Sequence, residues 1–318
     1  MTMASYLLRR FVYLIAVLLA VTFTVSIMMS LPAGDPAQVL AGVDATPAQI
    51  EAVREALKLD QPVLQRYGDW LSSAVTGDLG RSLRTGEPVI DTIRDRLPVT
   101  LQLVVMGQLL ALAFAVPIAV YGSYRPGRLL DSGSTVLSFL MISTPPFVVG
   151  LLLIRIFAVD LGWFPTGGWT PLTADPAASL RAALLPAVAI ALEPAGVYQR
   201  LLRSDMRRTL GEDFIMMAES KGLRPRRVLF RHSLRPSSFS LLTLMGIISA
   251  RMVGGAVVVE TIFGLPGLGR MLIDAVNFRD FIAVQGVVAV VAIAYVVINS
   301  IVDLTYGVVD PRVRTHAS

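Results

Sequence analysis

Six long apolar runs constrain the fold of this chain more than any other feature of its sequence. A helix needs about 20 apolar residues to cross the hydrocarbon core of a bilayer. The runs that reach this length are residues 11–31, 99–121, 135–159, 184–202, 239–259 and 281–309. Hydrophobic residues make up 54% of the chain and charged residues only 16%. These features predict an all-α integral membrane protein with six transmembrane helices, the first of them an uncleaved anchor.

The placement of arginine and lysine predicts the orientation of these helices, because cytoplasmic loops carry an excess of both. Basic residues precede the first run and follow the second, fourth and sixth runs, most densely in the loop at 203–236. We therefore expect both termini and this loop in the cytoplasm. The expected division is an N-terminal segment with the first helix at 1–31, an extracytoplasmic insert at 32–97, and a five-helix core at 98–318.

The insert at 32–97 contains a helix start signal. Thr46 and Gln49 have the spacing of a capping box, and Pro47 occupies the first helical position. A loop of this length is usually functional. We expect the insert to dock an external protein, and the alternative is a solvated lid with no specific partner.

The loop at 203–236 contains the pattern of a short amphipathic helix. Phe214, Met217 and Ala218 fall at helical spacing, and Lys221 continues on the same face. Gly222 can adopt the left-handed conformation that ends a helix. An apolar helix face exposed to the cytoplasm beside a membrane needs a partner. The sequence therefore predicts a docking helix in this loop.

Charges at both ends of this helix support its boundaries. Glu212 and Asp213 stand at its start, where the helix dipole favours carboxylates, and Lys221 stands at its end, where the dipole favours a cation. Pro225 is placed to open a second short helix, which we expect to run through Phe230.

A family resemblance enters at this loop. The heptapeptide MMAESKG at 216–222 resembles the loop through which permeases of binding-protein-dependent ABC importers couple to their ATPases. Four other segments resemble, in the right order, segments of the dipeptide/oligopeptide/nickel permease family of the first-permease type. They are LPAGDP at 31–36, GDLGRS at 77–82, VVETIFGLPGLGR at 258–270 and DPRVR at 310–314.

This resemblance implies a function and a set of partners. It implies a type I ABC importer permease fold in a prokaryotic inner membrane, forming half of a translocation pathway for peptides. Nickel complexes, glutathione and haem are the alternative substrates. The implied partners are a second homologous permease, ATP-binding subunits that hold ATP and Mg²⁺, an extracytoplasmic solute-binding protein and membrane lipid. The implied ATPase-coupling residues are Phe214, Met217, Ala218, Glu219, Lys221 and Gly222.

The sequence lacks the usual residues for catalysis and cofactor binding. No G-x-x-x-x-G-K-[ST] phosphate loop occurs, so we expect no nucleotide site on this chain. Cysteine is absent, and His232 and His316 are isolated from each other, which argues against a metal site. We therefore expect no enzyme activity and no cofactor on this chain. Nucleic-acid binding is also not expected, because the chain has no soluble basic domain with interleaved aromatic residues.

Three ionisable residues fall inside the predicted spans: Arg155, Glu193 and Arg251. A charge near the bilayer centre must face a cavity or a partner. One interpretation is a translocation path with basic groups for a substrate carboxylate. The other is structural pairing of Glu193 with either arginine, or snorkelling of Arg155 toward its helix end.

The fifth predicted span carries small residues at every fourth position. Gly246, Ala250 and Gly254 would form a stripe against which another helix can pack closely. That helix belongs either to this chain or to a second permease. The proline pair at 145–146 and Pro194 are expected to kink the third and fourth spans.

Two other classes of function remain to be weighed against the importer subunit. A secondary transporter would show inverted repeats and acidic ion-coupling residues at the membrane midplane. No clear repeat is present, and Glu193 is the only membrane carboxylate away from the predicted helix ends. A membrane-embedded enzyme would need clustered His, Asp or Glu side chains near one interface.

Overall fold

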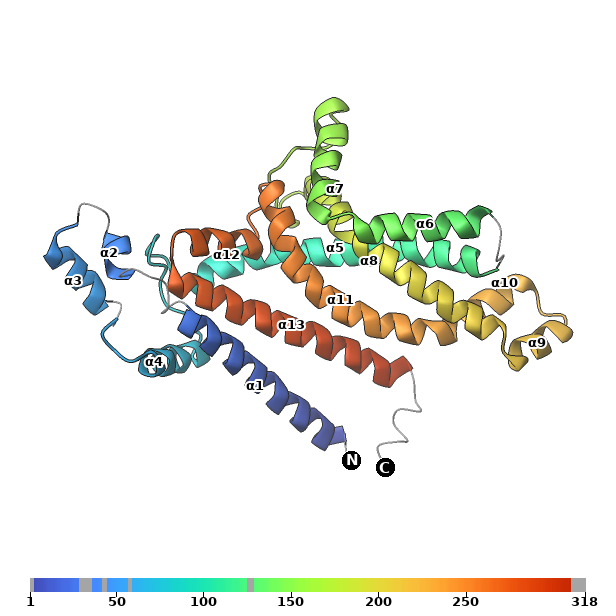
Figure 1. Ribbon diagram of the computed structural model, residues 1–318, viewed down its shortest axis with the longest axis horizontal. Coiled ribbons are helices and arrows are strands. Elements are labelled where there is room, and N and C mark those ends of the chain that lie inside the picture. Colours follow the sequence, from blue (N-terminus) through green and yellow to red (C-terminus); the bar gives the residue numbers. More distant parts are fainter. Residues whose placement is uncertain (1–2, 29–35, 42–44, 57–58, 125–128, 310–318) are drawn as a thin grey trace. The chain divides into compact units, whose positions relative to one another are not determined.

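The computed structural model describes residues 3–28, 36–41, 45–56, 59–124 and 129–309. These residues form helices and turns without a β-strand, apart from one isolated bridge between Arg81 and Pro88. The chain divides into two compact units, one made of 1–98 with 266–296 and the other of 99–265 with 297–318. Figure 1 shows the helices in chain order.

The first unit holds the insert and the helices at both ends of the chain. It contains α1 (Met3–Met28), α2 (Pro36–Ala41), α3 (Pro47–Ala56), α4 (Val63–Val75), the start of α5 (Val89–Tyr124), α12 (Leu268–Asn277) and most of α13 (Phe281–Val309). The predicted capping box is present at the start of α3. The amide of Thr46 donates to Oε1 of Gln49 at 2.9 Å, and the amide of Gln49 donates to Oγ1 of Thr46 at 3.4 Å.

A buried apolar cluster holds this unit together. Its members come from the segment that precedes and begins α5, from α12 and from α13: Leu79, Val89, Ile93, Leu268, Met271, Ala275, Ala283, Val284 and Val287. Tyr67 attaches α4 to α1, because its hydroxyl donates to the carbonyl of Leu19 at 3.1 Å and shares a 2.9 Å hydrogen bond with Thr22.

The second unit holds the rest of α5 and the remaining helices. They are α6 (Leu129–Ser143), α7 (Pro146–Leu153), the π-helix η1 (Ile154–Asp160), α8 (Pro176–Leu210), α9 (Asp213–Ser220), α10 (Pro225–Arg227), the π-helix η2 (Val228–Leu234) and α11 (Arg235–Ile262). Helices α6, α7 and α11 all pack against α8. The backbones of α6 and α8 come so close at Gly196 that an added Cβ would lie 2.8 Å from the carbonyl oxygen of Ser138.

Among the described residues, four helices are long and apolar enough to cross a membrane, or five if a bent pair forms one span: Val89–Tyr124, Pro176–Leu210, Pro225–Ile262 and Phe281–Ile298. They coincide with the second, fourth, fifth and sixth predicted runs. The first run lies in α1, where the apolar segment found among the described residues is Ile15–Met28. The count of six spans and the cytoplasmic termini therefore stay predictions.

The third predicted run, 135–159, is not one straight helix. It consists of the segments Ser132–Ser143 and Pro146–Asp160, which meet at an angle of 98° (Figure 1). Pro145 has an extended backbone and Pro146 begins α7, because proline disfavours a helical residue before it and cannot donate to the preceding turn. Helix α8 is uninterrupted at both Pro186 and Pro194, and the kink at Pro194 stays a prediction.

Candidate functional site

The predicted docking helix is α9, Asp213–Ser220, and its end is well defined. Gly222 has a φ of +75°. The amide of Gly222 donates to the carbonyl of Glu219 at 2.8 Å, and the amide of Leu223 donates to that of Ala218 at 3.2 Å. This pair of bonds is a Schellman motif, which satisfies carbonyls at the helix end and needs a left-handed residue. Gly222 is suited to that place because it has no Cβ.

The side chains of α9 divide between two faces. Ile215 and Ala218 are buried, 1% and 8% exposed, on the side where α9 contacts η2. Phe214 and Met217 are 48% and 61% exposed. Lys221 and Glu219 are exposed as well. Ala218 was expected on the docking face, but its burial places it in the contact between α9 and the rest of this chain. Ile215 belongs to the same contact and was not predicted from the sequence.

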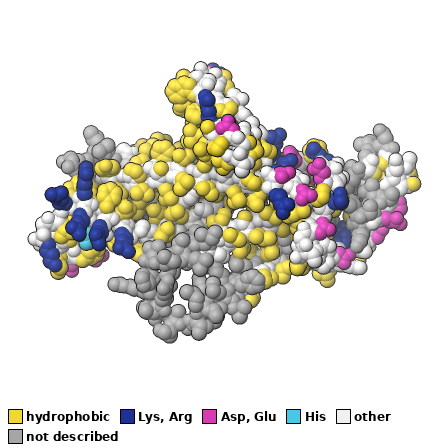
Figure 2. Space-filling view, turned by 180° about the vertical axis from the view of Figure 1, so that it is seen from behind, with side chains coloured by type: hydrophobic (Ala, Val, Ile, Leu, Met, Phe, Trp, Pro, Cys, Tyr) yellow, Lys and Arg dark blue, Asp and Glu magenta, His cyan; other side chains and the backbone are white. Residues whose placement is uncertain are grey.

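The second helix of the loop begins at Pro225, as expected, but does not end at Phe230. The helical segment continues through η2 into α11 and ends at Ile262. No glycine or proline occurs within η2 that would stop it. Helix α9 is therefore joined through one turn, α10 and η2 to a helix that is long and apolar enough to span a membrane. Figure 2 shows Lys and Arg side chains gathered at the end of this unit that carries α9 and α10.

The three candidate residues of the translocation path lie in different surroundings. Arg155 is on η1 and pairs with Asp160 at 3.1 Å, with both side chains largely exposed. Glu193 is half-buried and Arg251 is exposed. Within the described residues, no ion pair joins Glu193 to either arginine. Asp160, which the sequence analysis did not consider, is the partner of Arg155.

Arg251 belongs to an exposed stripe along α11. The members of this stripe recur every three or four residues: Thr243, Ile247, Arg251, Gly254 and Val258. A polar network lies behind the stripe, between α5, α8 and α11. In this network the hydroxyls of Tyr198 and Ser249 donate to Oε1 of Gln108 at 3.1 and 3.3 Å.

The predicted small-residue stripe does not form one face. Gly246 and Ala250 are buried within this chain, whereas Gly254 is exposed and has open space around a built Cβ. The physical reason is that every fourth residue of an α-helix drifts by about 40° around its axis. Gly246 and Ala250 therefore serve packing inside the chain, and only Gly254 is available to another chain.

Sequence analysis missed a buried carboxylate, Glu260. It lies in the last turn of α11, is 0% exposed, and accepts a 2.6 Å hydrogen bond from the hydroxyl of Thr100. The fifth run was expected to end at Val259, but α11 continues to Ile262. The signal that could have found Glu260 is its place in the VVETIFGLPGLGR segment, where it is the only carboxylate.

The GDLGRS segment at 77–82 is held to the start of α13. Asp280 is 3% exposed and accepts hydrogen bonds from the hydroxyl of Ser82, from the amide of Leu83 at 3.2 Å and from the amide of Ala283 at 3.1 Å. Its carboxylate therefore caps α13 and fixes a turn almost 200 residues earlier in the sequence.

We expect Asp280→Ala to destabilise the protein by about 1–3 kcal/mol, because the change removes a helix cap and leaves buried donors unpaired. Thermal unfolding of the purified protein measures this. Asp274 lines the same pocket as Asp280, but its carboxylate forms no hydrogen bond or ion pair with another described residue, so Asp274→Ala is the matched control. Equal effects of the two changes would contradict the capping role.

Two family models match this chain. The description "binding-protein-dependent transport system inner membrane component" matches residues 97–315, and the corresponding N-terminal model matches residues 3–104. The chain belongs to this family. The predicted all-α integral membrane class, the permease function and the multi-pass inner-membrane location are thereby confirmed.

Curated relatives of this permease family match nearly the whole chain. A putative peptide transport system permease protein of Brucella abortus is 38% identical, covering 98% of this chain and 99% of that protein. An oligopeptide transport system permease protein of Bacillus subtilis is 36% identical, with 98% and 100% covered. A glutathione transport system permease protein of Escherichia coli is 34% identical, with 98% and 99% covered.

A solved structure shares the permease fold. A chain from inward-facing conformations of the MetNI methionine ABC transporter superposes with a TM-score of 0.54 at 16% identity, covering 69% of this chain and 96% of that chain. At this identity the likeness concerns the fold alone. In the part of the chain that the structure describes, no group of three or more His, Asp or Glu side chains could hold a metal ion.

Proposed function

We propose that this permease is one of two permease subunits of an ATP-driven importer of peptides, and that it couples through α9 to a separate ATP-binding subunit. An extracytoplasmic solute-binding protein delivers the substrate. ATP and Mg²⁺ belong to the ATP-binding subunits. Peptide is preferred over nickel complexes, glutathione or haem because two of the relatives described above carry peptide or oligopeptide names.

The observation that carries this proposal is the division of α9 into two faces. Ile215 and Ala218 already have contacts in this chain, whereas Phe214 and Met217 expose apolar surface. An apolar patch of this kind beside basic residues is typical of a protein interface. The ATP-binding subunit is the partner that a permease of this family requires on that side.

The translocation path is assigned to the exposed stripe of α11. Arg251 lies within a helix that is apolar enough to span the bilayer, and it has no ion pair among the described residues. A charged side chain in this position must contact water, a partner residue or a substrate carboxylate. The open backbone at Gly254 leaves room for a substrate or for the second permease.

The domain division follows from the same topology. Residues 1–31 form the N-terminal segment and first span, 32–97 the extracytoplasmic insert, and 98–318 the five-helix core with the coupling loop at 203–236. The insert is assigned to docking of the solute-binding protein. Helix α4 of the insert exposes the polar side chains Gln65, Asp69 and Ser72 together with the apolar Leu64 and Val75, a mixture that suits a reversible contact.

Single-cysteine labelling tests this topology, since the natural chain contains no cysteine. Ser220 and Ser73 are both exposed. We expect a cysteine at position 220 to react with an impermeant maleimide only in inside-out vesicles, and a cysteine at position 73 only in right-side-out vesicles. Reversed labelling would contradict the six-span orientation.

The energy source of uptake tests the function itself. In vesicles that contain the complete complex and its solute-binding protein, we expect labelled peptide to accumulate only when ATP is present on the cytoplasmic side. An ionophore that dissipates ion gradients should leave this uptake unchanged. Accumulation driven by an ion gradient without ATP would instead support a secondary transporter.

A further inference from the structure

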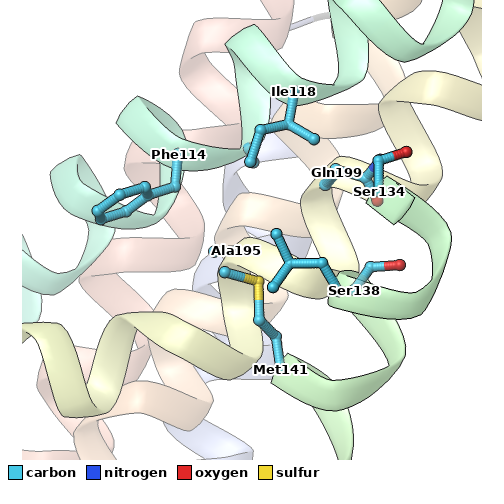
Figure 3. Close-up of a pocket in the computed structure, with 9 residues that line it drawn as sticks. Phe114, Ile118, Ser134, Ser138, Met141, Ala195 and Gln199 are labelled. Atoms are coloured by element: carbon cyan, nitrogen blue, oxygen red, sulfur yellow. The ribbon is translucent and has the colours of Figure 1, made fainter. Parts of the chain in front are cut away.

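A small pocket lies between α5, α6 and α8, within the second unit (Figure 3). Phe114, Ile118 and Met141 supply apolar walls, and Ser138 and Gln199 supply polar groups. The space open to the centre of a water molecule is about 10 Å³. That volume is enough for roughly one water molecule.

Gln199 is a buried amide without a protein partner. Its side chain is 2% exposed, and neither Oε1 nor Nε2 forms a hydrogen bond within the described residues. Gln199 lies in α8, one of the helices that can cross the membrane. Lipid tails carry no polar groups, so they cannot form the hydrogen bonds that its carboxamide lacks. A buried carboxamide normally satisfies most of its donors and acceptors.

The packing of α6 on α8 explains why the pocket exists. The two helices touch at Gly196, where a Cβ would lie 2.8 Å from the carbonyl oxygen of Ser138. Helices that cross at a close contact diverge on either side of it. Gln199 is one turn beyond the contact on α8, where the side chains no longer fill the space between the helices.

Ser138 offers an acceptor on the opposite wall. Its hydroxyl donates to the carbonyl of Thr135 at 2.9 Å, so its hydrogen is already used while its lone pairs can still accept. We propose that this pocket binds one ordered water molecule, which hydrogen-bonds to the carboxamide of Gln199 and donates to the hydroxyl oxygen of Ser138. The water joins α6 to α8, the helix that leads directly to α9.

X-ray radiolysis of the complete transporter complex in ¹⁸O-labelled water tests this proposal. Hydroxyl radicals formed from a bound water oxidise the nearest reactive side chain, which here is the thioether of Met141. We expect labelled Met141 sulfoxide in the natural protein and a roughly threefold or larger decrease in Gln199→Leu, which removes the groups that hold the water. Met206, 0% exposed, should stay unlabelled in both proteins, and Met28, which is 61% exposed and lies outside the proposed docking face, should label equally in both.

A second variant keeps the test decisive if Gln199→Leu does not assemble. Ser138→Ala removes the acceptor on α6 with little change in volume, and we expect it to lower Met141 labelling as well. Unchanged Met141 labelling in an assembled complex of either variant would overturn the water site. Because this readout involves no transport, its outcome is independent of the proposed import function.

Discussion

Replacing Phe214 and Met217 together by glutamate is expected to release the ATP-binding subunit while the permease itself stays folded. Both side chains are largely exposed in this chain, so its own packing does not depend on them. Burial of each in an interface would contribute about 1.5–3 kcal/mol, so their loss should weaken binding by at least about 100-fold. Co-purification of the ATP-binding subunit with the tagged permease measures the effect.

The matched control is Ile215→Glu on the same helix. Ile215 is 1% exposed, so a carboxylate there should destabilise the contact of α9 with its own chain. This variant should lower the thermal stability of the isolated permease, whereas the double variant of Phe214 and Met217 should not. If the double variant retains the ATP-binding subunit at natural levels, the exposed face of α9 is not the docking surface.

Arg251→Ala is expected to reduce peptide uptake by about tenfold or more without reducing assembly, because a charge-assisted hydrogen bond to a substrate contributes about 1.5–3 kcal/mol. Arg251→Lys should retain part of the uptake, since it keeps the charge. Arg155→Ala is the control. Its exposed pair with Asp160 contributes about 0–1 kcal/mol, so uptake and assembly should both change little.

The competing explanation for Arg251 is structural pairing with Glu193. In that case Arg251→Ala would destabilise the complex, and adding Glu193→Gln would restore it. A double-mutant cycle on both assembly and uptake separates the two explanations. We expect the effects of the two changes on assembly to be additive, because no ion pair joins the two residues in the described structure.

Local signals predicted the boundaries of α9 well. Asp213 at its start and Gly222 after its end act through the helix dipole and the left-handed turn, which depend on neighbouring residues alone. Which side chains of α9 are buried and which are exposed could not be predicted from neighbouring residues alone. Ile215 is buried within this chain, where α9 contacts η2, and that contact depends on the path of the chain beyond the helix.

Other features needed the tertiary structure for a similar reason. The proline pair at 145–146 predicted a kink, but not an angle of 98° between α6 and the following segment. The bond between Ser82 and Asp280 joins positions far apart in the sequence, which no local pattern indicates. The burial of Glu260 was missed because the predicted apolar run ended before this carboxylate, whereas α11 continues past it to Ile262.

Uptake by the permease reconstituted without its partners is the decisive test of whether this chain acts as one subunit of an ATP-driven importer. We expect no nucleotide hydrolysis and no uphill accumulation of labelled peptide by the lone chain, with or without ATP, because the chain has no phosphate loop. Adding the second permease, the ATP-binding subunits and the solute-binding protein should restore ATP-dependent uptake. Robust accumulation by the lone chain would contradict the claim that it acts as one subunit of an ATP-driven importer.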